Sequence, residues 1–306
     1  MTNSALNGSP IIGAIILNWN LPDQTLACVR ALGESTLKAD SVLVVDNGSS
    51  DESLAAIKRA LHANEVLGLP ENIGFAGGMN AGIREMRGRG MDYVLIMNND
   101  IHVAPDMLRR LVDEARIDPA CSIAAPVVYL TCPSDKIWHA GSRFGNFLLM
   151  PKRVGDTEIS RATTVEVDAV PASVWLLSVK AIDKIGVFDT RYFMYYEDWD
   201  YCWRARAAGL RILVVGGARA WHAVSASTRS IPELRQYHFS RGRTGYYLSH
   251  GPLFSRLAML VGLGLSEALV ALRLLLRGQF DAVGARLRGF MAGIALALDH
   301  RAGGQP

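Results

Sequence analysis

The chain has 306 residues, of which 50% are hydrophobic and 20% are charged, with a formal net charge of +3. This composition is typical of a folded protein with one large core or two modest ones, and it excludes a disordered chain. The four cysteines show no C-x-x-C spacing, which argues against a zinc knuckle or a disulfide framework and favours a reducing compartment. Residues 1–10 lack Lys and Arg, and the apolar run that follows is short, so we expect no export signal.

The charge is unevenly distributed along the chain. Residues 251–306 carry six basic and three acidic side chains, whereas residues 1–250 are balanced at 26 against 26. A nucleic-acid-binding body would need a basic surface, so we predict that this protein binds no nucleic acid. The excess of positive charge indicates that the C-terminal region has a partner of its own.

Residues 11–97 alternate between strand-like and helix-like segments. Apolar runs predict strands over residues 11–17, 41–45, 65–67 and 93–97. Helical patterns and capping residues predict helices over residues 25–32, from 49–52 to about 62, and over 80–87. Such alternation predicts an α/β fold with a mainly parallel sheet and helices on both faces.

Polar side chains follow two of these predicted strands. Asp46 ends the second strand, and Asn98-Asn99-Asp100 follows the strand over residues 93–97. Ligands of open α/β sheets bind at the carboxyl ends of strands, where Asp46 would suit a nucleoside and Asp100 a divalent metal carrying a diphosphate. The alternative is that both are ordinary turn residues, for which Asn and Asp are favoured.

Residues 72–82 contain four glycines ahead of a predicted helix. A glycine-rich loop lets the backbone approach a phosphate or a sugar closely. The segment has neither Gly-Lys-Ser/Thr nor the G-x-G-x-x-G spacing, which argues against ATPase and nicotinamide-binding functions.

Three carboxylates, Glu197, Asp198 and Asp200, lie among Tyr, Phe and Trp residues in the segment 192–206. Aromatic walls exclude water and offer stacking surfaces to sugar rings, and clustered carboxylates raise one another's pKa, which suits a general base. The alternative is an ordinary helix N-terminus whose acids pair with arginines one turn later. Further along, His222 follows a predicted strand over residues 211–215 and is a structural histidine unless the fold brings it to Asp100.

Taken in order, these motifs resemble glycosyltransferase family 2, and more narrowly its bacterial rhamnosyltransferase-like branch. The resemblance spans about residues 11–247 and rests on Val-Val-Asp-Asn-Gly-Ser-Ser-Asp around Asp46, the glycine-rich segment from Asn72, Asn98-Asn99-Asp100, Tyr-Glu-Asp-Trp-Asp ending at Asp200, and His222. It implies the GT-A nucleotide-diphospho-sugar transferase fold, with a mostly parallel central sheet flanked by helices and a C-terminal helical extension. It also implies a metal-dependent enzyme with an inverting mechanism.

The resemblance assigns roles to individual residues. Asp198 matches the catalytic base, while Asp100 and His222 match positions that hold Mn²⁺ or Mg²⁺. The implied donor-binding residues are Asn18, Asp46, Asn72, Gly74, Phe75, Gly77, Gly78, Asn80, Asn98 and Asn99. Supporting positions are Glu197, Trp199, Asp200 and Arg241. One departure is Asn98, which stands where the family's D-x-D motif has its first acid and adds no negative charge to the metal site.

The implied reaction moves a sugar from a nucleotide-diphosphate donor to a glycan or polyprenol-linked acceptor in cell-surface polysaccharide synthesis. The branch favours L-rhamnose from dTDP-rhamnose, and a UDP-hexose or UDP-N-acetylhexosamine is the alternative donor. A catalytically inactive nucleotide-sugar-binding scaffold of the same fold is the other hypothesis, and the substitution at Asn98 is its one hint.

We predict a catalytic domain over residues 1–250 and an amphipathic helical tail over residues 251–306. Between residues 257 and 276 the only charges are Glu267 and Arg273. On a helical wheel the polar side chains of this region fall within an arc of about 140°. This favours a helix lying in the plane of an anionic membrane, with the protein peripheral on the cytoplasmic face of the cytoplasmic membrane. The alternatives are packing against the catalytic domain and a homodimer formed through the tail.

Overall fold

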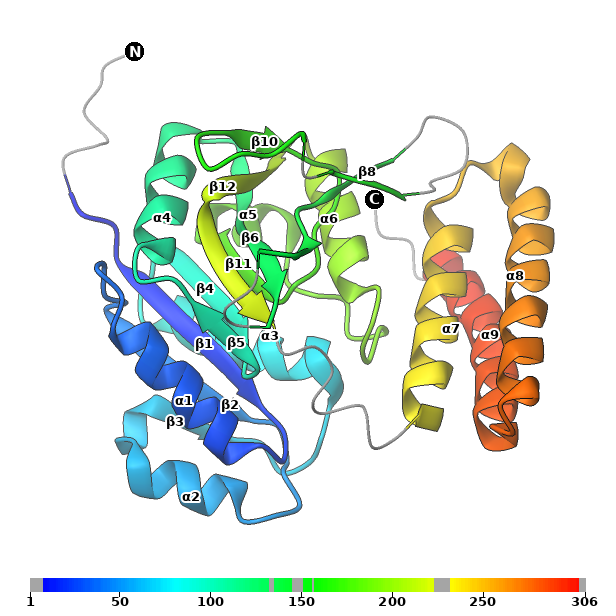
Figure 1. Ribbon diagram of the computed structural model, residues 1–306, viewed down its shortest axis with the longest axis horizontal. Helices are drawn as coiled ribbons and strands as arrows, with labels where there is room; N and C mark the ends of the chain where they lie inside the picture. The colour runs from blue at the N-terminus through cyan, green and yellow to red at the C-terminus, as the bar shows by residue number, and fades with distance from the viewer. Residues whose placement is uncertain (1–7, 132–134, 145–150, 156, 223–231, 303–306) are drawn as a thin grey trace.

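A computed structural model describes residues 8–131, 135–144, 151–155, 157–222 and 232–302. Figure 1 shows a central sheet covered by helices on both faces, with a bundle of long helices standing beside it. Residues 1–7 of the predicted catalytic domain and residues 303–306 of the predicted tail lie outside the described residues.

The first half of the sheet is parallel, as predicted. Its strands are β1 (Ile12–Asn18), β2 (Ser41–Asp46), β3 (Val66–Gly68) and β4 (Tyr93–Asn98), in the order β4-β1-β2-β3. They are connected by α1 (Pro22–Gly33), α2 (Ser53–Ala60), the short 3-10 turn η1 (Ala63–Glu65) and α3 (Gly74–Gly88). The apolar side chains of β1 alternate between two cores, one under α3 and one under α1, so both of its faces are buried.

The second half of the sheet is mixed. Strand β11 (Val174–Ser178) lies antiparallel between β4 and β6 (Cys121–Leu130), and β12 (Arg211–His222) runs parallel to β6. Shorter strands at its edges are β5 (Ile101–Val103), β7 (Ile137–His139) and β10 (Thr164–Glu166), and β8 (Ser142–Phe144) pairs with β9 (Pro151–Arg153). The flanking helices are α4 (Met107–Ile117), α5 (Val179–Ile185) and α6 (Glu197–Ala207). β12 continues well beyond the predicted 211–215 and carries His222 to the edge of the site.

The predicted glycine-rich loop is largely the start of α3. Gly78 and Gly82 lie one turn apart and face β1, where a Cβ would come within 2.7 Å of Leu17 Cδ1 and 2.8 Å of Ile15 Cγ2 respectively. These glycines let the helix approach the sheet closely. Tertiary packing therefore outweighs the low helix propensity of glycine in this segment.

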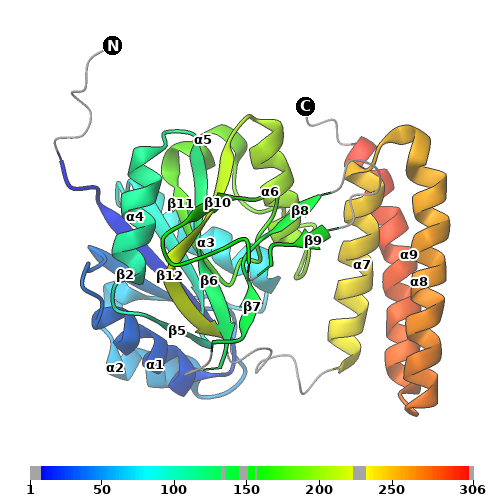
Figure 2. The ribbon, with the colours of Figure 1, turned by 45° about the horizontal axis from the view of Figure 1, so that its top comes forward.

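The C-terminal region forms a bundle of α7 (Pro232–His250), α8 (Arg256–Leu276) and α9 (Phe280–Ala302), with the 3-10 turn η2 (Leu253–Ser255) before α8. Gly289 and Gly293 bring α9 against α7, because a Cβ at these positions would lie 2.3 Å from Tyr237 O and 2.6 Å from Arg241 O. In Figures 1 and 2, α8 is the outermost helix, on the side away from the sheet. The predicted boundary after residue 250 falls between α7 and α8, and this division stays a prediction.

A buried ion pair joins the three helices of the bundle. Glu267 of α8 and Arg286 of α9 are 1% and 4% exposed, with Arg286 Nε 2.6 Å from Glu267 Oε2. Ser240 Oγ of α7 donates a hydrogen bond to the same oxygen at 3.0 Å, and Arg243 approaches Glu267 Oε1 at 3.4 Å. Glu267 belongs to the polar arc that we expected to face lipid headgroups, but its side chain points into the protein. That part of the prediction is therefore wrong.

Candidate active site

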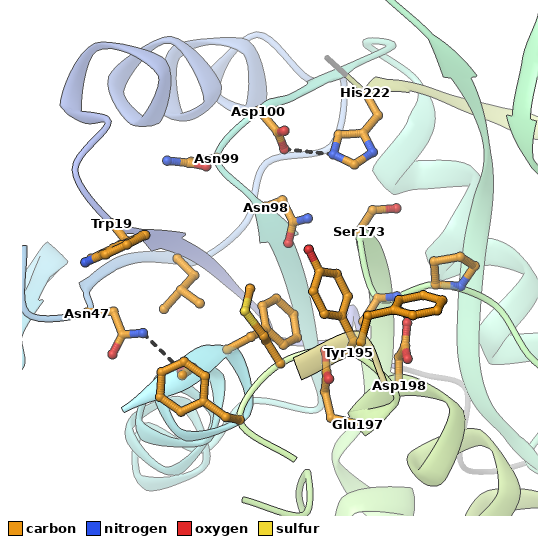
Figure 3. A pocket seen from close by; sticks show the side chains of 18 of the residues that line it. Trp19, Asn47, Asn98, Asn99, Asp100, Ser173, Tyr195, Glu197, Asp198 and His222 are labelled. Carbon is orange, nitrogen blue, oxygen red and sulfur yellow. Dashed lines mark hydrogen bonds and ion pairs between the residues drawn. The ribbon is translucent and has the colours of Figure 1, made fainter. Parts of the chain in front are cut away.

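A cavity of about 420 Å³ opens at the carboxyl ends of β1 and β4, between α6, α7 and the end of β12 (Figure 3). Nine of the residues predicted from the sequence line it. They are Asn72, Gly74, Phe75, Asn98, Asn99, Asp100, Glu197, Asp198 and His222. The structure thus brings together motifs that are up to 150 residues apart in the sequence.

Asp100 and His222 face each other on one side of the cavity (Figure 3). The turn between β4 and β5 supplies Asp100, and the last residue of β12 is His222. Asp100 Oδ1 lies 3.0 Å from His222 Nε2, and both side chains are less than 10% exposed, at 6% and 8%. The Trp138 ring packs edge-on against the imidazole, with 4.6 Å between the ring centroids. The condition set by the sequence for a functional His222, proximity to Asp100, is therefore met.

This pair fits a divalent cation. Ligand bonds of about 2.1 Å to an octahedral ion place neighbouring ligand atoms about 3 Å apart, close to the separation of Asp100 Oδ1 and His222 Nε2. A carboxylate oxygen and an imidazole nitrogen are both common ligands of divalent metal ions in proteins. Within the ranges that the structure describes, no group of three or more His, Cys, Asp or Glu side chains gathers here. The remaining ligands would therefore come from a bound molecule and water.

Glu197 and Asp198 lie on the opposite side of the cavity, in the first turn of α6. The chain enters this helix through Tyr195 and Tyr196, whose φ angles of 65° and 73° are left-handed. Such angles are uncommon for bulky residues and cluster at functional sites. The two tyrosines reverse the backbone so that both carboxyl groups point towards the cavity, with Tyr195 between them and Asn98 (Figure 3).

The two carboxyl groups differ in their protonation. Burial raises the pKa of Asp198 to about 6, against the opposing effect of hydrogen bonds from backbone N–H groups, including Trp199 at 2.8 Å and Ala172 at 3.3 Å. Burial, followed by repulsion from Asp198, raises the pKa of Glu197 well above its usual range. Near neutral pH, Asp198 is therefore ionised and able to accept a proton, and Glu197 keeps its proton to a higher pH than Asp198 does.

Asp200 has a structural role and does not line the cavity. It is 0% exposed and accepts hydrogen bonds from Arg204 Nε at 2.8 Å and His250 Nε2 at 2.9 Å. Burial acts to raise its pKa, but the hydrogen bond from His250 and the charge of Arg204 outweigh burial and lower it. The arginine also donates to the carbonyls of Ile185 and Val187. Asp200 thus connects α6 to α7 and to the preceding loop.

Asn18 and Asp46 lie beneath the cavity floor and not on its surface. Asn18 Nδ2 donates to Asp46 Oδ1 at 2.7 Å, and Thr25 Oγ1 donates to Asn18 Oδ1 at 2.6 Å. Asn99 Nδ2 then donates to Thr25 Oγ1 at 3.1 Å. Asp46 also accepts hydrogen bonds from the Ser49 hydroxyl and backbone N–H. This buried chain connects the end of β2 to the turn that carries Asp100.

The remaining predicted side chains also lie away from the cavity. Asn80 is 1% exposed and exchanges two hydrogen bonds with the backbone of Phe188, at 2.8 and 3.0 Å. Arg241 donates a hydrogen bond to the carbonyl of Arg191 at 2.6 Å. This bond connects α7 to the loop before α6. Trp199 packs its ring against Phe144, Tyr196 and Tyr246. Gly77 packs against the Ile73 side chain and Gly78 against Leu17, as the close contacts of α3 require.

Several cavity residues were absent from the sequence prediction. Asn47 is 3% exposed and holds the start of α3 through hydrogen bonds to Asn72 Oδ1 and Gly74 O, both at 3.0 Å. Its position beside Asp46 at a strand end was a usable signal. The other unpredicted lining residues are mostly aromatic or apolar: Leu17, Trp19, Trp138, Pro171, Ala172, Ser173, Phe193, Met194, Tyr195, Leu234 and Phe239.

The fold is that of the GT-A glycosyltransferases. The chain superposes on the crystal structure of GalNAc-T7 with UDP, GalNAc and Mn²⁺ with a TM-score of 0.59 at 13% identity, covering 83% of this chain and 53% of that one. It also superposes on the mannosyltransferase PcManGT from Pyrobaculum calidifontis in complex with GDP-Man and Mn²⁺, with a TM-score of 0.57 at 16% identity and 95% and 88% coverage. The predicted fold class is confirmed.

Residues 14–186 match the model of glycosyl transferase family 2, and the chain belongs to this family. It is 25% identical over 226 residues to the N-acetylglucosaminyl-diphospho-decaprenol L-rhamnosyltransferase of Mycobacterium tuberculosis, covering 67% of this chain and 73% of that protein. It is also 25% identical over 179 residues to the low-salt glycan biosynthesis hexosyltransferase Agl10 of Haloferax volcanii, with 56% and 54% coverage. The predicted family and its rhamnosyltransferase-like branch are confirmed.

Proposed function

We propose that this glycosyltransferase moves L-rhamnose from dTDP-rhamnose to a glycan or polyprenol-linked acceptor, with inversion at the anomeric carbon. The observation that carries the proposal is the arrangement of the cavity, which holds the carboxyl group of Asp198 across from the Asp100–His222 pair. The similarity to a mycobacterial rhamnosyltransferase supports the choice of sugar. A UDP-hexose or UDP-N-acetylhexosamine is the alternative donor.

The proposed reaction is a single displacement. The acceptor hydroxyl gives its proton to Asp198 while its oxygen bonds to the anomeric carbon. The bond from that carbon to the diphosphate oxygen breaks, and the nucleoside diphosphate leaves with the electron pair. Asp198 is suited to this step because burial raises its pKa to about 6. A general base is most effective when its pKa lies near the pH at which the enzyme works.

Asp100 and His222 would hold the divalent cation, which would neutralise charge on the leaving diphosphate. Asn98 lines the cavity beside them and adds no charge, since an amide stands where the family has a carboxylate. Its side-chain amide could hydrogen bond to the donor. The cation would therefore depend on one protein carboxylate, which predicts weaker metal binding than a D-x-D pair would give.

The donor and the acceptor would occupy different parts of the cavity. Trp19, Asn47 and Asn72 lie on the side of β1 and β2, where we place the nucleoside. On the side of Asp198, the lining residues Ala172, whose backbone N–H hydrogen bonds to Asp198, and Pro171 are apolar, and Tyr195 packs its ring edge-on against Phe239. An apolar wall next to the base suits an acceptor whose sugar is joined to a lipid. Such an acceptor would place the enzyme at the cytoplasmic face of the cytoplasmic membrane.

Release of nucleoside diphosphate tests the proposed reaction. The donors are dTDP-rhamnose, UDP-glucose, UDP-galactose, UDP-N-acetylglucosamine and GDP-mannose, each with Mn²⁺, with Mg²⁺ and with a chelator. We expect dTDP-rhamnose to be turned over fastest and the chelator to abolish turnover. Turnover of another donor would overturn the choice of sugar. Donor binding by thermal shift without turnover of any donor, in the presence of lipid-linked acceptors, would favour the inactive scaffold.

A further inference from the structure

Helix α8 exposes a continuous apolar surface along its full length. We define the outer face of α8 by six side chains spaced three or four residues apart, each more than half exposed: Leu257, Val261, Leu265, Leu269, Leu272 and Leu276. The helix has 21 residues, so this face is about 31 Å long. Figures 1 and 2 both show α8 on the side of the bundle away from the sheet.

The opposite side of α8 is buried and carries the polar group. Met259, Leu263, Ala271 and Leu274 pack inward, and between them Glu267 forms its ion pair with Arg286. A helix on the surface of a water-soluble protein keeps its apolar residues inside and its charged residues outside, whereas α8 is apolar on both sides and buries Glu267. Soluble monomers also rarely expose a continuous apolar surface of this extent. The outer face is therefore built to contact something other than water.

We propose that the outer face of α8 binds the surface of an anionic lipid bilayer, with the helix lying in the plane of the membrane. The face consists of Leu and Val and contains none of the Trp, Tyr or Arg residues that anchor protein interfaces. Among the described residues, α8 is the one helix that is long and apolar enough to cross a membrane, with a mean hydropathy of 1.9. Since α7 and α9 cover its other side, only the outer face is available to lipid.

Exposed charges on α8 and α9 favour anionic headgroups. Arg273 and Arg277 are exposed near the C-terminal end of α8, and Arg288 is exposed on α9. The exposed acids described on these two helices are Asp281 and Asp299. Arginines beside an apolar surface pair with lipid phosphates while the leucines enter the acyl boundary. The chain's net charge of +3, which resides in residues 251–306, agrees with this partner.

The bundle would hold the catalytic cavity in a fixed relation to the membrane. α7 lines the cavity through Leu234 and Phe239 and packs against α9, which in turn packs against α8. A lipid-linked acceptor could then present its sugar to Asp198 while its hydrocarbon chain stays in the bilayer. This last step rests on the proposed function, whereas binding of α8 to lipid does not.

Sedimentation of the full chain with vesicles tests the inference. The vesicles are phosphatidylcholine alone or phosphatidylcholine with phosphatidylglycerol. The test variant is Leu265→Glu with Leu269→Glu, and the matched control is Ile117→Glu, which charges an equally apolar side chain that is 76% exposed on α4. We expect the wild type and Ile117→Glu to bind anionic vesicles, and the double variant to bind at least about tenfold more weakly, because two leucines no longer leave water.

Three results would overturn the inference. One is equal vesicle binding by the double variant, and another is equal binding to vesicles without phosphatidylglycerol. The third is that the wild type binds no vesicles. If light scattering then shows that the wild type is a dimer and the double variant a monomer, the outer face of α8 is an interface between two copies of the chain. Nucleoside diphosphate release without vesicles should be unchanged in the double variant. Failure of the proposed reaction would appear as loss of that release with vesicle binding intact.

Discussion

The first turn of α6 and the interior of the C-terminal bundle both bury carboxylates, but their surroundings differ. In the bundle, Glu267 is held by Arg286, Arg243 and Ser240. In α6, Asp198 accepts hydrogen bonds from backbone N–H groups, and Glu197 Oε2 is buried with no partner among the described residues. A buried acid paired with a cation joins helices together, whereas a buried acid without one keeps a raised pKa and can transfer a proton.

The largest expected effect is on turnover. Asp198→Asn should lower kcat by about 10²- to 10⁴-fold, because the acceptor hydroxyl loses its base. Donor affinity should change little, since Asp198 lies across the cavity from the Asp100–His222 pair. Nucleoside diphosphate release measures the first quantity and donor titration by calorimetry the second. If Asp198→Asn kept full turnover, Asp198 would not be the base of the reaction.

Within the bundle the expected effect is on stability. Glu267→Gln should lower the free energy of unfolding by about 3–5 kcal/mol, because Arg286 is left buried without a countercharge. Glu267→Leu combined with Arg286→Leu should recover most of the loss. The control is Glu85→Gln, which removes an exposed ion pair with Arg89 and should cost less than about 1 kcal/mol. Urea denaturation measures all three, and equal losses for Glu267→Gln and Glu85→Gln would contradict this assignment.

A pH profile tests the protonation states in α6. Because Asp198 with its pKa of about 6 must be ionised to accept a proton, kcat/KM should be constant above that pH. Below it, kcat/KM should fall about tenfold per pH unit. Glu197→Gln should leave the inflection nearly in place, because Asp198 loses its proton before Glu197 does. An inflection near pH 4, the ordinary range of an aspartate, would show that burial does not raise this pKa.

The smallest effect concerns the hydrogen-bond chain under the cavity. Thr25→Val keeps the shape of the side chain but removes the hydroxyl between Asn18 and Asn99. We expect a loss of about 1 kcal/mol in stability and a modest increase in KM for the donor, because the turn that carries Asp100 is held less firmly. Thr36→Val, at an exposed threonine near Pro105, is the control and should leave KM unchanged. A large fall in kcat for Thr25→Val would indicate a role in the chemical step.

Features that are local in sequence were predicted well. Strands β1, β2 and β4 were readable because their apolar runs end in polar turns. The cavity residues Asp100, Asp198 and His222 were readable because their motifs resemble a family. The start of α3 was misread because glycine's low helix propensity hides close packing on β1. The antiparallel insertion of β11 depends on pairing across more than 70 residues, for which the sequence has no local signal.

The tail shows the same limit. Helical spacing revealed that α8 has a polar arc and an apolar arc, but spacing does not say which arc faces the protein. That depends on Arg286, which lies on another helix 19 residues away. The contribution of Leu234 and Phe239 to the cavity was equally invisible, because it follows from how α7 packs against the turn before α6.

Gly242 of α7 lies directly against that turn. A Cβ at this position would come within 2.4 Å of the carbonyl oxygen of Tyr195, whose left-handed backbone orients Glu197 and Asp198. α9 then packs over α7 at Gly289 and Gly293. During synthesis, every polar residue that lines the cavity is added to the chain before α7. The chain therefore contains Asp100, Asp198 and His222 early, but the cavity is completed only when α7 and α9 have packed against the rest of the protein.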